Sequence, residues 1–521
     1  MTSPKTGVIV SLVVISGMVI WFELVVSHSF IGSDDAYIHL RYIDNLRSGN
    51  GFGFNPGKPS NGSTSPLWVL LASVVTRGAV NLPTAAKLLS TVLFVLSILA
   101  FFAFTRSLTD SPTVAALASV VYASYPWLLK WAGSAMETSL VAFLILSAGY
   151  FFIRVDKHRD LILASLLLGL STLARPEVVL LFVLFLLLVL MTGESSSLRI
   201  RRLSTAIGTY LAVLGPWLLF SWSEFGSVLP NTFAAKIVAS ESSIGGVGWY
   251  FLRVIGVTYW LWILVFLCLA FLTLRNFNAR VLPSLDFKKR AVILLWAWCA
   301  IVPVFYALGK LQTPSSRYLQ ITTPILIALG CHGFMCLVNK RSSERQSKRR
   351  PLIFMVAGTA VAVFCNIVLN ALVVFPSSQD FSEGVLKTYE TVGEWLGAKT
   401  PERSRVAVLT DIGVIGYVSH REIIDLGGLN TPEAIAYVPD NLGYVFESKP
   451  EYLVLTSEDS EHALLGQGRF QGVASLVLSL PVDIGLRGGI EEATGGRKRG
   501  NFHVSAYRLL WSAKGRRQVA E

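Results

Sequence analysis

The chain has 521 residues, of which 53% are hydrophobic and only 15% are charged, and its formal net charge is +12. Soluble domains carry about 25% charged residues, so this composition excludes an ordinary soluble protein and indicates an integral membrane protein. Because the basic residues occur in short runs between apolar segments rather than in one continuous patch, nucleic-acid binding is not expected.

Eleven apolar stretches are candidates to cross a hydrocarbon core of about 30 Å. They lie at residues 7–27, 84–105, 112–129, 136–153, 160–174, 177–192, 203–221, 249–274, 291–309, 318–338 and 352–375. The first has no small-residue cleavage site, so we predict a retained helix rather than a removed signal peptide. The shorter apolar segment at 67–80 contains Arg77 and is predicted to form a helix at the membrane interface.

The basic residues indicate which side each connection faces. Cytoplasmic connections carry the excess of Lys and Arg, and the N-terminus together with alternate connections holds 19 of the 45 basic residues in short pieces. We therefore predict a multi-pass protein of the plasma (inner) membrane with a cytoplasmic N-terminus. The first loop, residues 28–83, and the C-terminal segment are predicted to be extracytoplasmic.

From residue 376 the pattern becomes that of a soluble α/β domain. The β-branched runs at 406–410 and 452–456 predict strands, and a helical pattern covers 384–396. The predicted fold class is a polytopic α-helical membrane protein with about 11 transmembrane helices and an extracytoplasmic α/β domain. The predicted domains are residues 1–375 and 376–521.

The unusual polar residues fall on the predicted outer side, in five different loops. They are Asp34, Asp35, Arg41, Tyr42, Thr64, Glu137, Arg175, Glu177, Asn231, Lys236, Arg317 and Tyr318. Simpler explanations stay open: an acid can cap the helix that follows residue 33, other acids can compensate helix N-termini, and arginines can extend to the interface. Their collection on one side favours a single outward-facing site.

These residue types suit one kind of chemistry. Carboxylates can deprotonate an incoming hydroxyl or bind a cation, and Arg or Lys can hold a phosphate head group. Phosphate leaves readily once cations stabilise its charge. The composition of the site therefore favours transfer of a group from a lipid phosphate.

Several motifs also carry a resemblance to a known family. Residues 34–42 (DDAYIHLRY), 49–51 (GNG), 54–57 (FNPG) and 63–68 (STSPLW) resemble the first extracytoplasmic loop of bacterial polyprenyl-phosphate-sugar glycosyltransferases with the GT-C fold. The chain resembles the mycobacterial terminal arabinofuranosyltransferase group and, more distantly, protein mannosyltransferases and aminoarabinose transferases. Motifs later in the sequence also resemble this family, so the resemblance covers nearly the whole chain. These later motifs are residues 136–138 (MET), 174–177 (ARPE), 229–232 (LPNT), 317–318 (RY) and 411–413 (DIG).

The resemblance implies a function and residue roles. A pentose or hexose would move from a polyprenyl-phosphate donor to a hydroxyl of a cell-envelope acceptor, which is a glycan, a lipid or a protein, with inversion at the anomeric carbon. The resemblance places the catalytic role of the first-loop acid on Asp34, with Asp35 as its partner or substitute. The donor phosphate would be held by some of Arg41, Arg175, Lys236 and Arg317.

Cofactor use and two rival functions remain to be tested. A Mg²⁺ or Ca²⁺ ion bound by Asp34 and Asp35 stays open, whereas zinc is not expected because the candidate site contains neither Cys nor His. A lipid or polysaccharide transporter would have repeated halves and acids at the membrane midplane, and the sequence shows neither. A non-catalytic glycan-assembly protein of the same fold would have no need of the intact Asp pair.

Overall fold

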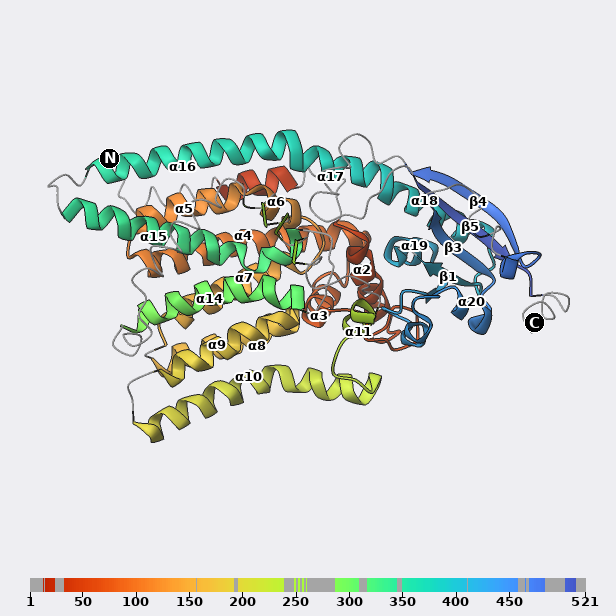
Figure 1. The fold of residues 1–521 in the computed structure, drawn as a ribbon, viewed down its shortest axis with the longest axis horizontal. Helices are drawn as coiled ribbons and strands as arrows, with labels where there is room; N and C mark the ends of the chain where they lie inside the picture. The colour runs from red at the N-terminus through yellow and green to blue at the C-terminus, as the bar shows by residue number, and fades with distance from the viewer. Residues whose placement is uncertain are drawn as a thin grey trace.

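The computed structural model describes residues 13, 15–23, 32–155, 157–191, 195–238, 248–249, 252–253, 255–256, 259, 286–308, 316–343, 349–409, 411–457, 464, 468–482 and 502–511. Within these residues the molecule is elongated, with a bundle of helices at one end and a sheet at the other (Figure 1). Most of the predicted span 249–274, and much of 7–27, lie outside the described residues.

The helices of the bundle correspond to the other predicted spans. They are α4 (Leu82–Thr109), α5 (Pro112–Ser124), α6 (Pro126–Ala132), α7 (Thr138–Phe152), α8 (His158–Ala174), α9 (Val179–Leu190), α10 (Ser196–Phe225), α14 (Phe287–Leu308), α15 (Thr323–Ser343) and α16 (Arg349–Leu369). Among the described residues, four helices are long and apolar enough to cross a membrane, and α5 with α6 makes a fifth candidate that bends by 65°. A protein with several apolar helices is confirmed, while the number eleven stays a prediction.

Local sequence signals explain where these helices begin. At α4 the side chain of Asn81 accepts a hydrogen bond from the amide of Thr84 at 3.0 Å, and Pro83 occupies the first turn, where its missing N–H costs nothing. Farther along α4, Phe94 and Phe101 are buried and stack on Tyr122 of α5, with ring centroids 5.6 and 4.5 Å away. The helices therefore pack through large aromatic side chains as well as through small ones.

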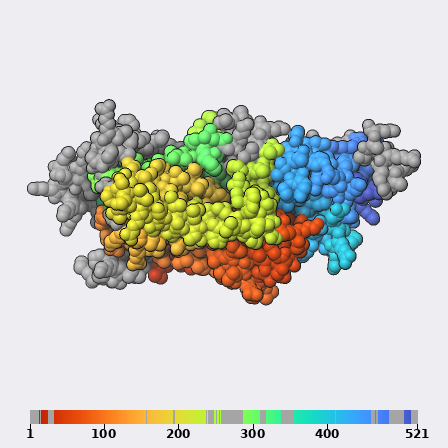
Figure 2. Space-filling view, turned by 90° about the horizontal axis from the view of Figure 1, so that it is seen from below, coloured from red at the N-terminus to blue at the C-terminus, as the bar shows by residue number. Residues whose placement is uncertain are grey.

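The first loop contributes helices that lie between the bundle and the sheet. These are α2 (Asp34–Arg47) and α3 (Pro66–Val75), which lie where a helix after residue 33 and an interfacial helix were predicted. The short helix α11 (Asn231–Val238) contacts the first loop outside these helices, where the main-chain amide of Asn231 donates to Asn61 O. Viewed from below, the surface of the first loop, in orange, adjoins both the yellow-green surface of α10 and α11 and the blue C-terminal part (Figure 2).

The C-terminal part contains a five-stranded mixed sheet. Its strands are β1 (Arg405–Leu409), β2 (Glu422–Asp425), β3 (Tyr452–Ser457), β4 (Ala474–Val482) and β5 (Phe502–Leu509), in the spatial order β2-β1-β3-β5-β4. The first three are parallel and the last two pair antiparallel. The two strands predicted from β-branched runs are confirmed as β1 and β3.

Both faces of this sheet are covered. Along β1, Val406 and Val408 belong to the large core shared with α18 (Lys387–Lys399) and α19 (Ile412–Ser419), whereas Ala407 packs on the opposite face with Leu453 and Tyr507. Strands that are buried on both faces are apolar at every position rather than at alternate positions. This explains why β1 and β3 are continuous hydrophobic runs.

One long helix joins the bundle to the sheet. From Ile353 to Lys399 the chain is helical for 47 residues, running through α16, α17 (Phe375–Phe381) and α18 along the upper edge of the molecule (Figure 1). Two π-helical segments, Asn370–Val374 and Ser382–Leu386, interrupt it. The predicted domain division at residue 376 falls inside this helix.

Candidate active site

The first turn of α2 brings one acid of the Asp pair against an arginine from a distant part of the chain. Arg317, in the 3₁₀ helix Ser316–Ile321, donates a hydrogen bond to Asp35 Oδ2 at 2.5 Å. The Asp35 side chain is 40% exposed, whereas that of Arg317 is 7% exposed. The carboxylate that is accessible to a substrate is therefore that of Asp35, and its partner is a buried cation.

Behind this pair lies a buried network of charges. Glu137, just before α7, binds Arg175 at 2.6 Å and His39 at 3.3 Å. Arg175 also lies 3.6 Å from Glu177, which accepts a hydrogen bond from Tyr306. Because all of these side chains are nearly inaccessible, they depend on one another for charge compensation.

Tyr318 connects the two arginines. The guanidinium carbons of Arg175 and Arg317 lie 5.0 and 5.2 Å from the centre of its ring, and Arg317 also lies 5.9 Å from the ring of Trp131. These are distances for cation–π attraction. The aromatic rings therefore help to hold the two arginines close together, while Glu137, Glu177 and Asp35 compensate their charges.

Asp34 faces a different partner from its neighbour. Its Oδ2 accepts a hydrogen bond from the amide of Gly413 at 2.9 Å, and its Oδ1 accepts one from the amide of Val414 at 2.8 Å. Burial and the nearby Asp411 carboxylate raise the pKa of Asp34 well above its ordinary value, although these amide hydrogen bonds lower it. Asp34 thus satisfies the N-terminal amides of α19, as a capping residue does, but from another part of the chain.

The close approach of α19 to α2 requires a glycine. A Cβ atom on Gly413 would lie 2.2 Å from the main-chain oxygen of Asp34. We expect Gly413→Ala to separate α19 from α2, because main-chain atoms at this distance cannot yield locally. Limited proteolysis of the protein in nanodiscs would reveal the change as faster cleavage of the C-terminal part. Gly468→Ala, at a site with open space around its Cβ, is the control, and equal cleavage of both variants would contradict the expectation.

Two other predicted site residues hold the first loop against the C-terminal part. The guanidinium of Arg41 donates to the main-chain carbonyls of Phe54, Gly416 and Arg421 at 2.5 to 3.0 Å. The hydroxyl of Tyr42 donates to Asn430 Oδ1 at 2.7 Å. All three guanidinium nitrogens of Arg41 donate to main-chain carbonyls, so the proposed mechanism does not use Arg41 to hold the donor phosphate.

The structure thus divides the predicted residues into groups. It brings together Asp35, Glu137, Arg175, Glu177, Arg317 and Tyr318. Asp34, Arg41 and Tyr42 face the C-terminal part. Thr64 is half-buried next to Ser63. Asn231 is the first residue of α11, and its main-chain amide donates to Asn61 O at 2.8 Å. The side chain of Lys236 lies outside the described residues.

The sequence reasoning missed His39 and Tyr306. His39 bonds to Ser63 Oγ at 3.3 Å through Nδ1 while its Nε2 faces Glu137. It stands four residues after Asp35 on α2, and residues at this spacing share a helix face. This spacing could have identified His39, whereas no local signal points to Tyr306.

The described residues offer few protein ligands for a divalent cation, and the predicted Mg²⁺ or Ca²⁺ ion stays a prediction. In the described part of the chain no group of three or more His, Cys, Asp or Glu side chains could hold a metal ion. Both oxygens of Asp34 accept main-chain amides, and Asp35 is paired with Arg317, so a Mg²⁺ or Ca²⁺ ion here would take most of its oxygen ligands from water and from a bound phosphate. We therefore derive no step that uses a metal.

Parts of the sequence are similar to known proteins. A family described as a domain of unknown function (DUF8728) matches residues 381–507. A terminal β-(1→2)-arabinofuranosyltransferase of Mycobacterium tuberculosis is 27% identical over 226 residues, which is 40% of this chain and 35% of that protein. The match thus spans about a third of the length of the curated relative.

Solved structures resemble the whole molecule. The oligosaccharyltransferase of Archaeoglobus fulgidus in its apo form aligns with a TM-score of 0.58 at 13% identity, covering 87% of this chain and 70% of that one. ArnT of Cupriavidus metallidurans, solved with undecaprenyl phosphate, also aligns with a TM-score of 0.58, at 14% identity, covering 96% of this chain and 98% of that one. The predicted resemblance is confirmed at the level of the fold: this chain has the GT-C fold of membrane glycosyltransferases.

Proposed function

We propose that the protein is a membrane glycosyltransferase that moves a sugar from a polyprenyl-phosphate donor to a hydroxyl of a cell-envelope acceptor. The observation that carries the proposal is the pair of half-exposed Asp35 and buried Arg317, with a second arginine, Arg175, also close to the ring of Tyr318. The GT-C fold supports it, since ArnT of Cupriavidus metallidurans was solved with undecaprenyl phosphate.

In the mechanism that we propose, the donor phosphate displaces Asp35 from Arg317. Phosphate oxygens match the guanidinium in the same bidentate manner as a carboxylate does. The released Asp35 carboxylate accepts the proton of the acceptor hydroxyl, and the hydroxyl oxygen forms a bond with the anomeric carbon. The bond from that carbon to the phosphate oxygen breaks with its electron pair, which leaves an inverted glycoside and polyprenyl phosphate.

Asp34 has a positioning role in this proposal. By holding the N-terminus of α19 it fixes the C-terminal part against α2 and so sets the direction in which Asp35 faces. We propose further that residues 1–375, with the first loop 28–83, form the catalytic domain in the plasma (inner) membrane. Residues 376–521 would form an extracytoplasmic domain above it, with the N-terminus in the cytoplasm.

The function can be tested through its unused substrate. When the protein is removed from its host, mass spectrometry of the lipids should show one polyprenyl-phosphate sugar that accumulates, and its mass gives the class of sugar. Loss of a transporter could also raise a lipid-linked sugar, so the purified protein in detergent must then transfer that sugar to envelope material with no membrane compartments present. Transfer by the wild-type protein separates the two functions, and its absence would contradict the proposal.

Binding of the donor phosphate should depend strongly on Arg317. A hydrogen bond to a charged group contributes about 1.5–3 kcal/mol, so we expect Arg317→Gln to raise the KM for the donor about 10- to 100-fold. Arg317→Lys should recover part of the loss, because it restores the charge without the bidentate geometry. Arg508→Gln, at an exposed position on β5, is the matched control, and an equal KM in both Gln variants would count against the phosphate site.

A further inference from the structure

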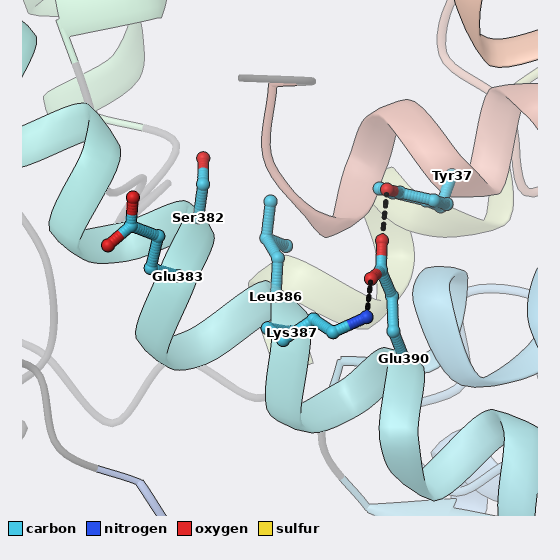
Figure 3. A pocket seen from close by; sticks show the side chains of 6 residues that line it. All are labelled: Tyr37, Ser382, Glu383, Leu386, Lys387 and Glu390. Atoms are coloured by element: carbon cyan, nitrogen blue, oxygen red, sulfur yellow. Dashed lines mark hydrogen bonds and ion pairs between the residues drawn. The ribbon is translucent and has the colours of Figure 1, made fainter. Parts of the chain in front are cut away.

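We propose that a groove between α2 and the π-helical segment Ser382–Leu386 binds a sugar unit of the acceptor, and this inference rests on the proposed function. The groove has a volume of about 250 Å³ and is lined by Tyr37, Ser382, Glu383, Leu386, Lys387 and Glu390 (Figure 3). A single water occupies about 30 Å³ of liquid volume, so the groove has room for a ligand much larger than a water molecule or a monatomic ion.

Most of the side chains that line the groove carry a polar end. Five of its six side chains end in a hydroxyl, a carboxylate or an ammonium group, and only Leu386 is apolar. Glu390 is held on both oxygens, since Tyr37 donates to Oε1 at 3.1 Å and Lys387 donates to Oε2 at 3.3 Å (Figure 3). A carboxylate oxygen has more than one acceptor direction, so Glu390 can accept further hydrogen bonds from a ligand in a fixed geometry.

The charges of the groove distinguish between classes of ligand. Two carboxylates and one ammonium group give the lining a formal net charge of −1, which disfavours a phosphate head group. Glu383 has no ion-pair partner within the described part of the chain and can accept strong hydrogen bonds from hydroxyl groups. A neutral ligand that carries many hydroxyl groups fits this lining best, and a sugar unit is such a ligand.

The π-helical segment gives the groove its shape. Glu383, Lys387 and Glu390 follow one another at intervals of four and three residues, so they form one polar stripe on this side of the helix. A π-helical turn is wider than an α-helical turn, and such segments are frequent at functional sites.

The position of the groove relates it to the proposed site. Tyr37 stands two residues after Asp35 on α2, which is a rise of about 3 Å along the helix axis and a rotation of about 200°. The groove and the Arg317 pair therefore lie on opposite sides of the same helix end. An acceptor chain of several sugars that crosses the N-terminus of α2 would place one sugar in the groove and a later one at Asp35, because a helix with its side chains is about 10–12 Å across.

The experiment measures sugar binding directly. Full-length protein in nanodiscs, free of sugar-based detergents, is examined by saturation-transfer NMR with methyl α-arabinofuranoside, methyl α-mannoside and a disaccharide of each. We expect signals from at least one of the disaccharides, and we expect Glu383→Gln and Lys387→Met each to weaken its binding about tenfold or more, since one charge-assisted hydrogen bond contributes about 1.5 kcal/mol or more. Glu394→Gln, at an exposed position on α18, should leave binding unchanged.

The outcomes separate this inference from the proposed function. If no sugar binds, if both groove variants bind as the wild type does, or if inorganic phosphate competes with the sugar in the groove, the inference is wrong. Accumulation of a lipid-linked sugar in the deletion strain, with transfer by the purified protein, would still support the proposed function in that case. Sugar binding that needs Glu383 without any transfer would support a groove of a glycan-binding protein and contradict the glycosyltransferase.

Discussion

Replacement of Asp35 by asparagine is expected to lower kcat by about 10²- to 10⁴-fold, which is the contribution of a well-placed general base. The amide side chain of the Asp35→Asn variant keeps an oxygen that can accept a hydrogen bond from Arg317, so the local geometry should survive while the base is lost. Transfer of labelled sugar from lipid donor by purified protein measures the effect, and the thermal stability of the variant shows whether the fold is intact.

The neighbouring variant Asp34→Asn supplies the comparison. Its amide nitrogen cannot accept from the main-chain amides of Gly413 and Val414 together with its oxygen, so we expect faster proteolysis of the C-terminal part. Any loss of activity in the Asp34→Asn variant should be indirect and should increase with the separation of α19 from α2. A fully active Asp35→Asn protein, beside an Asp34→Asn protein that is inactive but resistant to proteolysis, would reverse the two roles.

The second large effect is expected at Arg175, on the stability of the protein. Arg175→Met leaves Glu137 and Glu177 without the cation that they share, and removal of one partner of a buried ion pair costs about 3–5 kcal/mol. Thermal unfolding in nanodiscs should show a much lower midpoint. Most of the loss of stability comes from the buried Glu137 carboxylate that is left without a cation. The double variant Arg175→Met with Glu137→Gln should therefore unfold at a higher temperature than Arg175→Met alone.

A small change at Arg175 would contradict this account of the network. If Arg175→Met lowers the free energy of unfolding by less than about 1 kcal/mol, the arginine behaves as an exposed ion pair does. Its ion pair with Glu137 would then contribute little to the free energy of unfolding. Arg405→Met, at an exposed ion pair with Glu451 in the sheet, gives the scale for such a weak effect.

Much of the site follows from the sequence because membrane topology is a simple constraint. Charged residues at the same end of different spans must lie near one another once the spans pack into a bundle. Glu137, Arg175 and Arg317 come from three separate connections and meet for this reason. The helix after residue 33 and the strands β1 and β3 follow from local periodicity, which needs no knowledge of distant contacts.

The different roles of Asp34 and Asp35 cannot be predicted from the local sequence. Successive residues on a helix point about 100° apart, so Asp34 and Asp35 must face different surroundings, but the surroundings come from elsewhere. Asp34 meets α19 about 380 positions later in the chain, and Arg41 is engaged by carbonyls that are equally remote. An arginine in a loop looks the same whether phosphate or carbonyl oxygens surround it, so only tertiary structure separates the two.

The continuous helix from Ile353 to Lys399 has a mechanical consequence. Its 47 residues amount to a rod of about 70 Å, one end of which lies among the spans while the other carries the sheet. A rod of this length works as a lever, so a tilt of about 10° at the membrane end would displace the far end by roughly 12 Å. Since α19 is bound to α2 through Asp34, a thinner or thicker bilayer that tilts the rod would pull on the helix that presents Asp35. Bilayer thickness would in this way affect the rate of the sugar transfer that we propose.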